Sequence, residues 1–150
     1  MSVGRIVVGV DGSDGSLAAL RWAGDEAQQR GASLHVVHAW LAPYVGDISG
    51  MAAIASGQDA FEVAARQVLD QSVEAAGPAL TDLPVDRALV HGDAASTLLS
   101  AAADAELLVV GARGHGGFIG LLLGSVSSQC THHAPCPVVI VPPVSGRGAT

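Results

Sequence analysis

The sequence predicts an α/β fold in three layers, with a five-stranded parallel sheet of order 3-2-1-4-5 and helices on both faces. Short apolar runs recur five times, and segments with helical spacing lie between them. The runs are rich in Val, Leu and Ile with little polar alternation, which is typical of strands buried on both faces. Right-handed crossovers restrict the connections, and this order puts the first and fourth strands side by side.

The elements follow from local patterns in chain order. We expect strands at Arg5–Val10, Ala32–Trp40, Val85–Val90, Leu107–Val110 and Pro137–Val141. We expect helices that begin after a cap at Ser13 or Asp14 and end at Gly31, and then over Phe61–Ala76, Ala94–Ala103 and Val126–His133. The stretch Leu41–Gln58 contains Pro43 and several glycines among small apolar residues, so we expect a loop with little fixed structure there.

Composition sets limits on the function. At 150 residues, with 49% hydrophobic residues, the chain fits one domain over residues 1–150 with a sizeable core. A net charge of −7, without any basic run, excludes the electrostatic footprint of a nucleic-acid binder. No apolar segment reaches membrane-spanning length. The N-terminus lacks a signal-peptide pattern, so we expect a cytoplasmic protein.

Two cysteines suit a reducing compartment, because they make no disulfide framework. Cys130 and Cys136 flank His132 and His133, and together the four could be drawn as a zinc cluster. The spacing matches no standard finger, and prolines interrupt it. We therefore favour buried thiols and histidines that complement the end of a helix, and we expect no metal site in the protein.

The stretch from Ala105 to Val141 carries most of the functional information. An apolar strand ends at Gly111, a glycine-rich loop follows, and Gly124-Ser125 begins a helix. Glycines let backbone N–H groups converge on oxygen-rich ligands, and a helix start adds unpaired N–H groups and partial positive charge. This order therefore predicts an anion site for a phosphate ester, above all a nucleotide. The Walker loop is excluded because the chain has no lysine, and the dinucleotide fingerprint does not fit the spacing.

The glycines and serine have a demanding spacing: Gly111, two residues, Gly114, nine residues, then Gly124-Ser125. This resembles the nucleotide-binding motif G-x2-G-x9-G-[ST] of the universal stress protein family. The resemblance extends over nearly the whole chain, through VVGVDGS, VVHAW, GDAASTLL and CPVVIV. The alternative is a glycine-rich connector, since 19 of the 150 residues are glycine.

The resemblance implies that the ligand is ATP, and it assigns roles to individual residues. Asp11 would contact the nucleoside, with Gly9 at the same strand end. The backbone of Ala39 would read the adenine edge, and Gly111 would face the ribose. The phosphates would be held by four residues, mostly through their backbone N–H groups: Gly114, Gly124, Ser125 and Val126. The remaining candidate ligand-binding positions lie in the loop itself: Ala112, Arg113, His115, Gly116 and Gly117.

Several of these residues have a structural alternative. Asp11 could instead be a turn or helix-capping residue, and Arg113 either pairs with phosphate or is a solvated charge. Trp40 could line the adenine pocket or pack in the core. The remaining histidines are expected to be strand or loop residues rather than ligands: His35, His38 and His91.

We expect an ATP-binding regulatory protein of the stress response rather than an enzyme, and we identify no catalytic residue. The sequence has no paired carboxylates at useful spacing, no G-x-S-x-G elbow and no metal cluster. Mg²⁺ can still enter bound to the phosphates. The alternatives are a slow ATP hydrolase and an interaction module that works without nucleotide. We also expect a homodimer through the edge strand Pro137–Val141, whereas no pattern identifies a partner protein.

Overall fold

The computed structural model describes residues 3–41, 48–114 and 123–143, with only the backbone for residues 48–58. Its strands are β1 (Arg5–Gly9), β2 (Ser33–Trp40), β3 (Val85–His91), β4 (Leu107–Gly111) and β5 (Val138–Val141). Its helices are α1 (Asp14–Arg30), α2 (Ile48–Ala75), α3 (Ala94–Ala101) and α4 (Ser125–His133), with short 3₁₀ turns η1 (Gly77–Leu80) and η2 (Ala102–Asp104).

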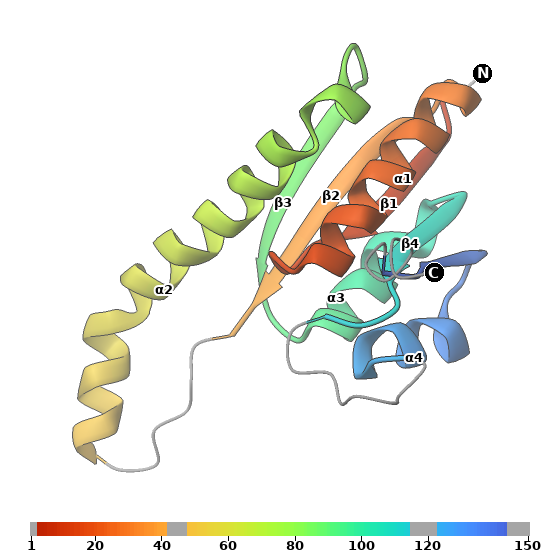
Figure 1. The fold of residues 1–150 in the computed structure, drawn as a ribbon. Coiled ribbons are helices and arrows are strands. Elements are labelled where there is room, and N and C mark those ends of the chain that lie inside the picture. Colours follow the sequence, from red (N-terminus) through yellow and green to blue (C-terminus); the bar gives the residue numbers. More distant parts are fainter. Residues whose placement is uncertain (1–2, 42–47, 115–122, 144–150) are drawn as a thin grey trace, which may run out of the picture.

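The strands form one parallel sheet of order β3-β2-β1-β4-β5, so the predicted topology is confirmed (Figure 1). β1 lies between β2 and β4, and Ile6 is in register with Leu107. β2 continues alongside β3 as far as Trp40, whereas its pairing with β1 stops at Val37. The carboxyl ends of β1 and β4 therefore meet where the direction of winding reverses, which is where ligands bind in such sheets.

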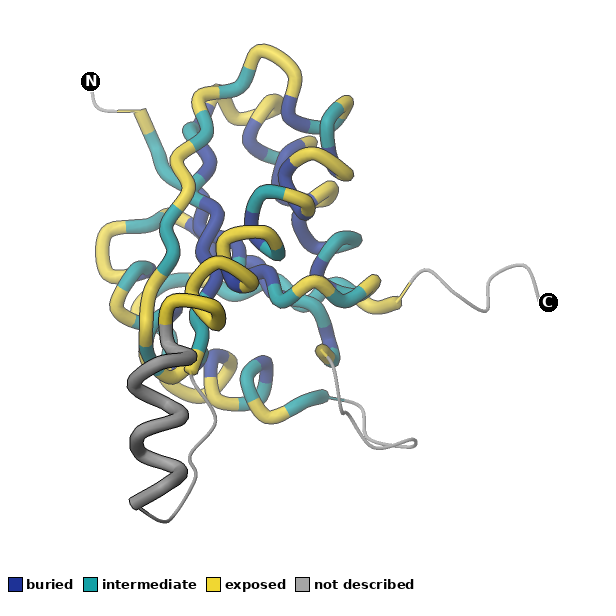
Figure 2. The backbone as a smooth tube through the Cα atoms, turned by 90° about the vertical axis from the view of Figure 1, so that its left-hand side faces the viewer, coloured by how far each residue is buried: buried dark blue, intermediate teal, exposed yellow. Residues whose placement is uncertain are grey.

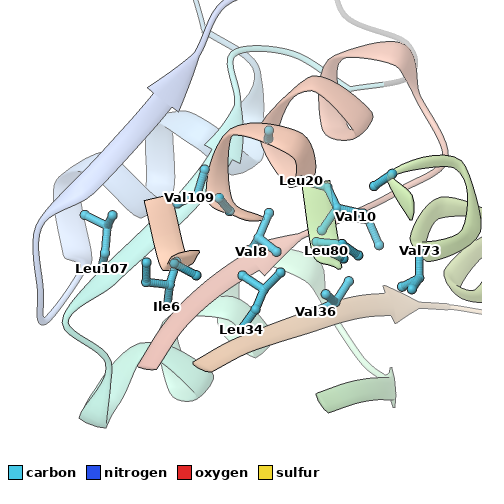
Figure 3. Close-up of a cluster of buried hydrophobic side chains, with 14 of the residues drawn as sticks. Ile6, Val8, Val10, Leu20, Leu34, Val36, Val73, Leu80, Leu107 and Val109 are labelled. Atoms are coloured by element: carbon cyan, nitrogen blue, oxygen red, sulfur yellow. The ribbon is translucent and has the colours of Figure 1, made fainter. Parts of the chain in front are cut away.

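Two apolar clusters hold the layers together. α1 and α2 cover one face of the sheet, and α3 and α4 cover the other. The first cluster includes Ile6, Val8 and Leu20, between the sheet and α1 (Figure 3). The second joins Val7 and Leu108 to the helices of the opposite face. Figure 2 shows the buried positions gathered along the central strands, with exposed positions on the outer sides of the helices. A sheet buried on both faces explains the near-continuous apolar runs in the sequence.

The ends of the helices agree with the predicted capping pattern. Ser13 is the N-cap of α1 and its hydroxyl accepts a hydrogen bond from the Ser16 N–H. Gly31 ends α1 in the left-handed conformation, with a φ of 67°. Glycine adopts this conformation without the steric cost that a side chain brings, and this explains its place at the helix end.

The expectation of a loop over Leu41–Gln58 is wrong from Ile48 onward. Residues 42–47 lie outside the described residues, but α2 already begins at Ile48, thirteen residues before the expected start. Between Ile48 and Gln58 the sequence contains no proline, and its two glycines cost only about 1 kcal/mol each in a helix. Extending an existing helix needs no new nucleation. The residues around those glycines that favour helix therefore extend α2 toward its N-terminus.

Candidate functional site

A cavity of about 530 Å³ lies at the carboxyl ends of β1 and β4. Its apolar wall includes Val37 of β2, Leu98 of α3 and Val126 of α4. Its polar groups come from the β1–α1 turn, from the base of the Gly-rich loop and from the first turn of α4. Of the predicted site residues, the cavity is lined by Gly9, Asp11, Ala39, Gly111, Arg113, Gly114, Gly124, Ser125 and Val126. The sequence motif and the first strand therefore contribute to one cavity.

One predicted residue, Ala112, is described but does not line the cavity, and three others are not described. Ala112 lies at the base of the loop, and its carbonyl is occupied by bonds within the protein. His115, Gly116 and Gly117 lie outside the described residues, so their assignment stays a prediction.

The turn after β1 is held by a compact set of side-chain hydrogen bonds. Asp11 Oδ1 accepts from the backbone N–H of Ser13 at 2.9 Å and from the Ser13 hydroxyl. The Asp11 N–H donates to the Ser16 hydroxyl at 3.2 Å, and that hydroxyl donates to the Ser13 carbonyl at 3.1 Å. Gly12 has a φ of 84°, which explains why a glycine follows the aspartate. Asp11 thus has the turn role that was considered as an alternative, and it also lines the cavity.

Asp11 also lies directly against the Gly-rich loop. A Cβ added at Gly114 would be 2.1 Å from Asp11 Oδ2, far inside contact distance. The loop and the β1–α1 turn can approach this closely only because residue 114 has no side chain. Arg113 is the one cationic side chain, and Asp11 the one carboxylate, among the described residues that line the cavity.

Gly111 and Gly9 both lie in close contact with other parts of the protein, Gly111 against backbone and Gly9 against a side chain. A Cβ on Gly111 would lie 2.8 Å from the Gly15 carbonyl oxygen in the first turn of α1. A Cβ on Gly9 would lie 2.7 Å from Leu98 Cδ1, in the wall of the cavity. A side chain at position 9 would therefore meet the wall of the cavity as well as narrow the space for a ligand.

The base of the Gly-rich loop is closed by hydrogen bonds on one carbonyl. The Ala112 oxygen accepts from the Gly124 N–H at 2.7 Å and from the Ser127 hydroxyl at 2.7 Å. Ser127 is only 2% exposed. It was not among the predicted residues, because only the folded loop brings it to Ala112. The run of hydroxyl residues in the first turn of α4 was the available signal.

The first turn of α4 has the features of an anion site. Gly124 is the N-cap and makes no side-chain capping bond. A glycine cap leaves the N–H groups of the first turn without a side-chain acceptor, and the helix dipole adds partial positive charge there. Ser125 and Val126 border the cavity in this turn. The Ser125 hydroxyl accepts from Gln129 Nε2 at 3.2 Å.

The other candidates from the sequence lie away from this cavity. The Trp40 ring lies 4.5 Å from the His91 ring, centroid to centroid, at the end of the β2–β3 pair. Cys130 is fully buried, and burial raises the pKa of its thiol.

Within residues 3–41, 48–114 and 123–143, no three His, Cys, Asp or Glu side chains gather closely enough to hold a metal ion. No helix in the same ranges is long and apolar enough to cross a membrane.

The fold agrees with what comparison with known proteins finds. A model of the universal stress protein family matches residues 2–142. The chain belongs to this family. A universal stress protein of Mycolicibacterium smegmatis is 36% identical over 138 residues, which are 92% of this chain and 45% of the relative. Another, from Mycobacterium tuberculosis, is 39% identical over 135 residues, 90% of this chain and 44% of the relative. The chain spans less than half the length of these relatives.

Solved structures of universal stress proteins share the fold. UspA from Lactobacillus plantarum superimposes with a TM-score of 0.79 at 23% identity, over 94% of this chain and 99% of the other. A universal stress protein solved in complex with cAMP gives a TM-score of 0.67 at 28% identity, over 95% of this chain and 99% of that one. A family member from Archaeoglobus fulgidus in complex with dAMP gives 0.67 at 23% identity, covering 94% and 99%.

Proposed function

We propose that this universal stress protein binds ATP in the cavity between the ends of β1 and β4, and that it acts as a nucleotide-dependent regulator of the stress response. The carrying observation is the convergence of three elements on one cavity: the strand end at Ala39, the β1–α1 turn and the first turn of α4, whose glycine cap has no side chain. The structure in complex with cAMP, at 28% identity, supports an adenine nucleotide as the ligand class. The free thiols of Cys130 and Cys136 support a reducing, cytoplasmic setting.

The lining residues fit such a ligand chemically. The apolar wall suits a base, whereas Arg113 and the first-turn N–H groups of α4 suit phosphate oxygens. The Ala39 backbone offers a donor and an acceptor at the end of β2. Adenine presents an acceptor at N1 and a donor at its 6-amino group, whereas guanine reverses both. The backbone of Ala39 would therefore select adenine over guanine.

A regulator is favoured over a hydrolase by the cavity's few ionisable groups. Asp11 is the one carboxylate among the described lining residues, and Ser13 occupies its Oδ1. General-base catalysis needs a carboxylate or imidazole that is free to take a proton from water. Mg²⁺ would accompany the phosphates of ATP, and Asp11 is the carboxylate that the described lining residues offer to it.

The test is direct. Mass spectrometry of the denatured, freshly purified protein identifies any nucleotide that copurifies. Calorimetry then compares ATP, AMP, cAMP and GTP, and we expect the adenine compounds to bind more tightly than GTP. A multiple-turnover assay with Mg²⁺ distinguishes the slow hydrolase. Absence of binding by all four nucleotides would leave the nucleotide-independent interaction module as the better account.

We further propose a homodimer through β5. β3 and β5 are the two edges of the sheet. β3 carries the exposed charged residues Asp86 and Arg87, which protect an edge against pairing, whereas β5 is the apolar run VVIV. Pairing β5 with its copy across a two-fold axis would satisfy the outward backbone groups of the unprotected edge.

A further inference from the structure

The backbone of β2 continues past the end of its pairing with β1. The last backbone bond between the two strands in the described chain is from the Val10 N–H to the Val37 oxygen, at 2.9 Å. Residues of β2 alternate in the neighbour that they bond. Ser33 donates to Gly4 on the β1 side, and Leu34 donates to Pro84 on the β3 side.

This alternation fixes the direction of the Ala39 backbone. Ala39 lies an even number of residues from Ser33 and Val37. Its N–H and C=O therefore both point toward the β1 side, as theirs do. The next residue, Trp40, accepts from Gly92 at 2.9 Å on the β3 side, which confirms the alternation. In an uninterrupted parallel ladder the Ala39 N–H would donate to the Val10 carbonyl.

The Val10 carbonyl has a different donor here. His38 Nδ1 lies 2.8 Å from the Val10 oxygen, and His38 is only 9% exposed. A carbonyl oxygen can only accept, so this imidazole carries its proton on Nδ1. A side chain of β2 thus takes the carbonyl that the Ala39 N–H would otherwise meet.

We propose that His38 is a positioning residue for the nucleotide site. By holding the Val10 carbonyl, it keeps the end of β1 from continuing along β2, and it leaves the Ala39 N–H and C=O facing the cavity. Two other groups of the β1–α1 turn, the Asp11 N–H and the Asp11 carboxylate, bond Ser16 and Ser13 rather than β2. At this end of the two strands, His38 is thus a β2 side chain that fixes the path of β1. This inference rests on the proposed function, since it assigns adenine recognition at that site to the Ala39 edge.

A buried histidine that only satisfies a carbonyl would have the same hydrogen bond, so the test must report on the Ala39 edge. Hydrogen exchange of the unaltered protein, followed by NMR, provides this readout. We expect the Ala39 amide to exchange quickly in the free protein and to become protected when AMP is added. The Val37 and His38 amides, which lie within the ladder, should be protected in both states.

Two variants then test the role of the side chain. His38→Phe keeps an aromatic ring without a donor, and His38→Asn restores an N–H donor near the position of Nδ1. Their affinities for AMP are compared with those for 1-deazaadenosine 5′-monophosphate, which lacks the N1 acceptor that the Ala39 N–H would meet. We expect His38→Phe to lose AMP affinity by about tenfold and to lose most of the preference for AMP, as for one lost hydrogen bond. His38→Asn should recover both.

The outcomes separate this inference from the proposed function. If the unaltered protein binds no adenine nucleotide, the proposed function is wrong and this inference falls with it. If AMP binds but the Ala39 amide is already protected without it, or stays unprotected with it, the inference alone is wrong. The same holds if His38→Phe weakens both ligands by an equal factor, because that is the effect of a purely structural residue. If His38→Phe does not fold, the exchange experiment on the unaltered protein still decides.

Discussion

Single side chains determine how the β1–α1 turn meets the Gly-rich loop. Asp11 uses Oδ1 to hold Ser13, while Oδ2 lies against Gly114. One carboxylate therefore shapes the turn, forms part of the cavity wall and limits the size of residue 114. The motif alone could not show this, because Asp11 and Gly114 are distant in sequence and meet only after β1 and β4 pair.

Two variants separate the roles of Asp11. Asp11→Asn keeps an oxygen acceptor for Ser13 but removes the charge, whereas Asp11→Ala removes both. If Asp11 contacts the nucleoside, Asp11→Ala should weaken ATP binding by about 1–3 kcal/mol. Calorimetry measures the affinity, and thermal melting without nucleotide measures the fold. A sharp fall in melting temperature for Asp11→Ala, with Asp11→Asn near the unaltered protein and the affinity of folded molecules unchanged, would show a turn role alone.

Gly114→Glu should abolish ATP binding. The new side chain would place a second carboxylate beside Asp11, at the end of the cavity assigned to phosphate, and would repel an anionic ligand. Gly77→Glu is the matched control, because it makes the same change of charge where an added Cβ meets nothing within 4 Å. Calorimetry should find ATP binding retained in the control. Equal ATP affinity in both variants would contradict the site.

At the level of elements, the close approach of α1 to its neighbours sets the shape of the site. Gly24 allows α1 to contact the turn η1, since an added Cβ would lie 2.6 Å from the Ala79 carbonyl oxygen. Gly111 does the same at the end of β4. The sequence predicted the strands and the motif, because these depend on local periodicity and spacing, and the handedness of crossovers restricted the strand order. It could not predict the start of α2, the closure by Ser127 or the contact from His38 to Val10, which depend on tertiary packing.

Gly24→Ala tests the packing of α1. The added methyl group meets a backbone carbonyl that cannot move independently, so we expect a loss of about 1–3 kcal/mol in the free energy of unfolding. Urea denaturation provides the measurement. Gly77→Ala should change stability far less, because the space around Gly77 is open. Equal stability of the two variants would show that α1 does not press on η1 in solution.

His35 should make the stability of the sheet depend on pH. Its Nδ1 is buried without a partner among the described residues. Burial lowers the pKa of His35 below 6.5, the nearby Arg5 charge lowers it further, and Asp86 opposes both. The unfolded chain therefore takes up the proton first as the pH falls below about 6.5, and stability is lost until the folded-state pKa is passed. His35→Gln should reduce this loss in urea titrations between pH 7.5 and 5.5. If the free energy of unfolding depends on pH equally in His35→Gln and the unaltered protein, the loss of stability comes from other groups.

For the whole molecule, the unprotected edge of the sheet decides the expected assembly. The backbone of β5 bonds β4 through alternate residues: Leu108 donates to Pro137 at 3.0 Å, and Ala112 donates to Val141 at 3.0 Å. Val139 lies two residues from both Pro137 and Val141, so its backbone N–H and C=O also face β4. The N–H and C=O groups of Val138 and Ile140 therefore point outward, away from β4. A second copy of β5 would pair through these groups.

The alternation of backbone groups along β5 provides a matched pair of variants that test the homodimer. Ile140→Pro removes an outward N–H and should give a monomer, because proline is tolerated where an edge strand's N–H faces outward. Val139→Pro removes an N–H that faces β4, so it should destabilise the fold itself. Light scattering at micromolar concentration should find the unaltered protein dimeric and Ile140→Pro monomeric. The melting temperature of Ile140→Pro should be closer to that of the unaltered protein than the melting temperature of Val139→Pro is. A monomeric unaltered protein, or a dimer that survives Ile140→Pro, would show that β5 does not pair the two copies.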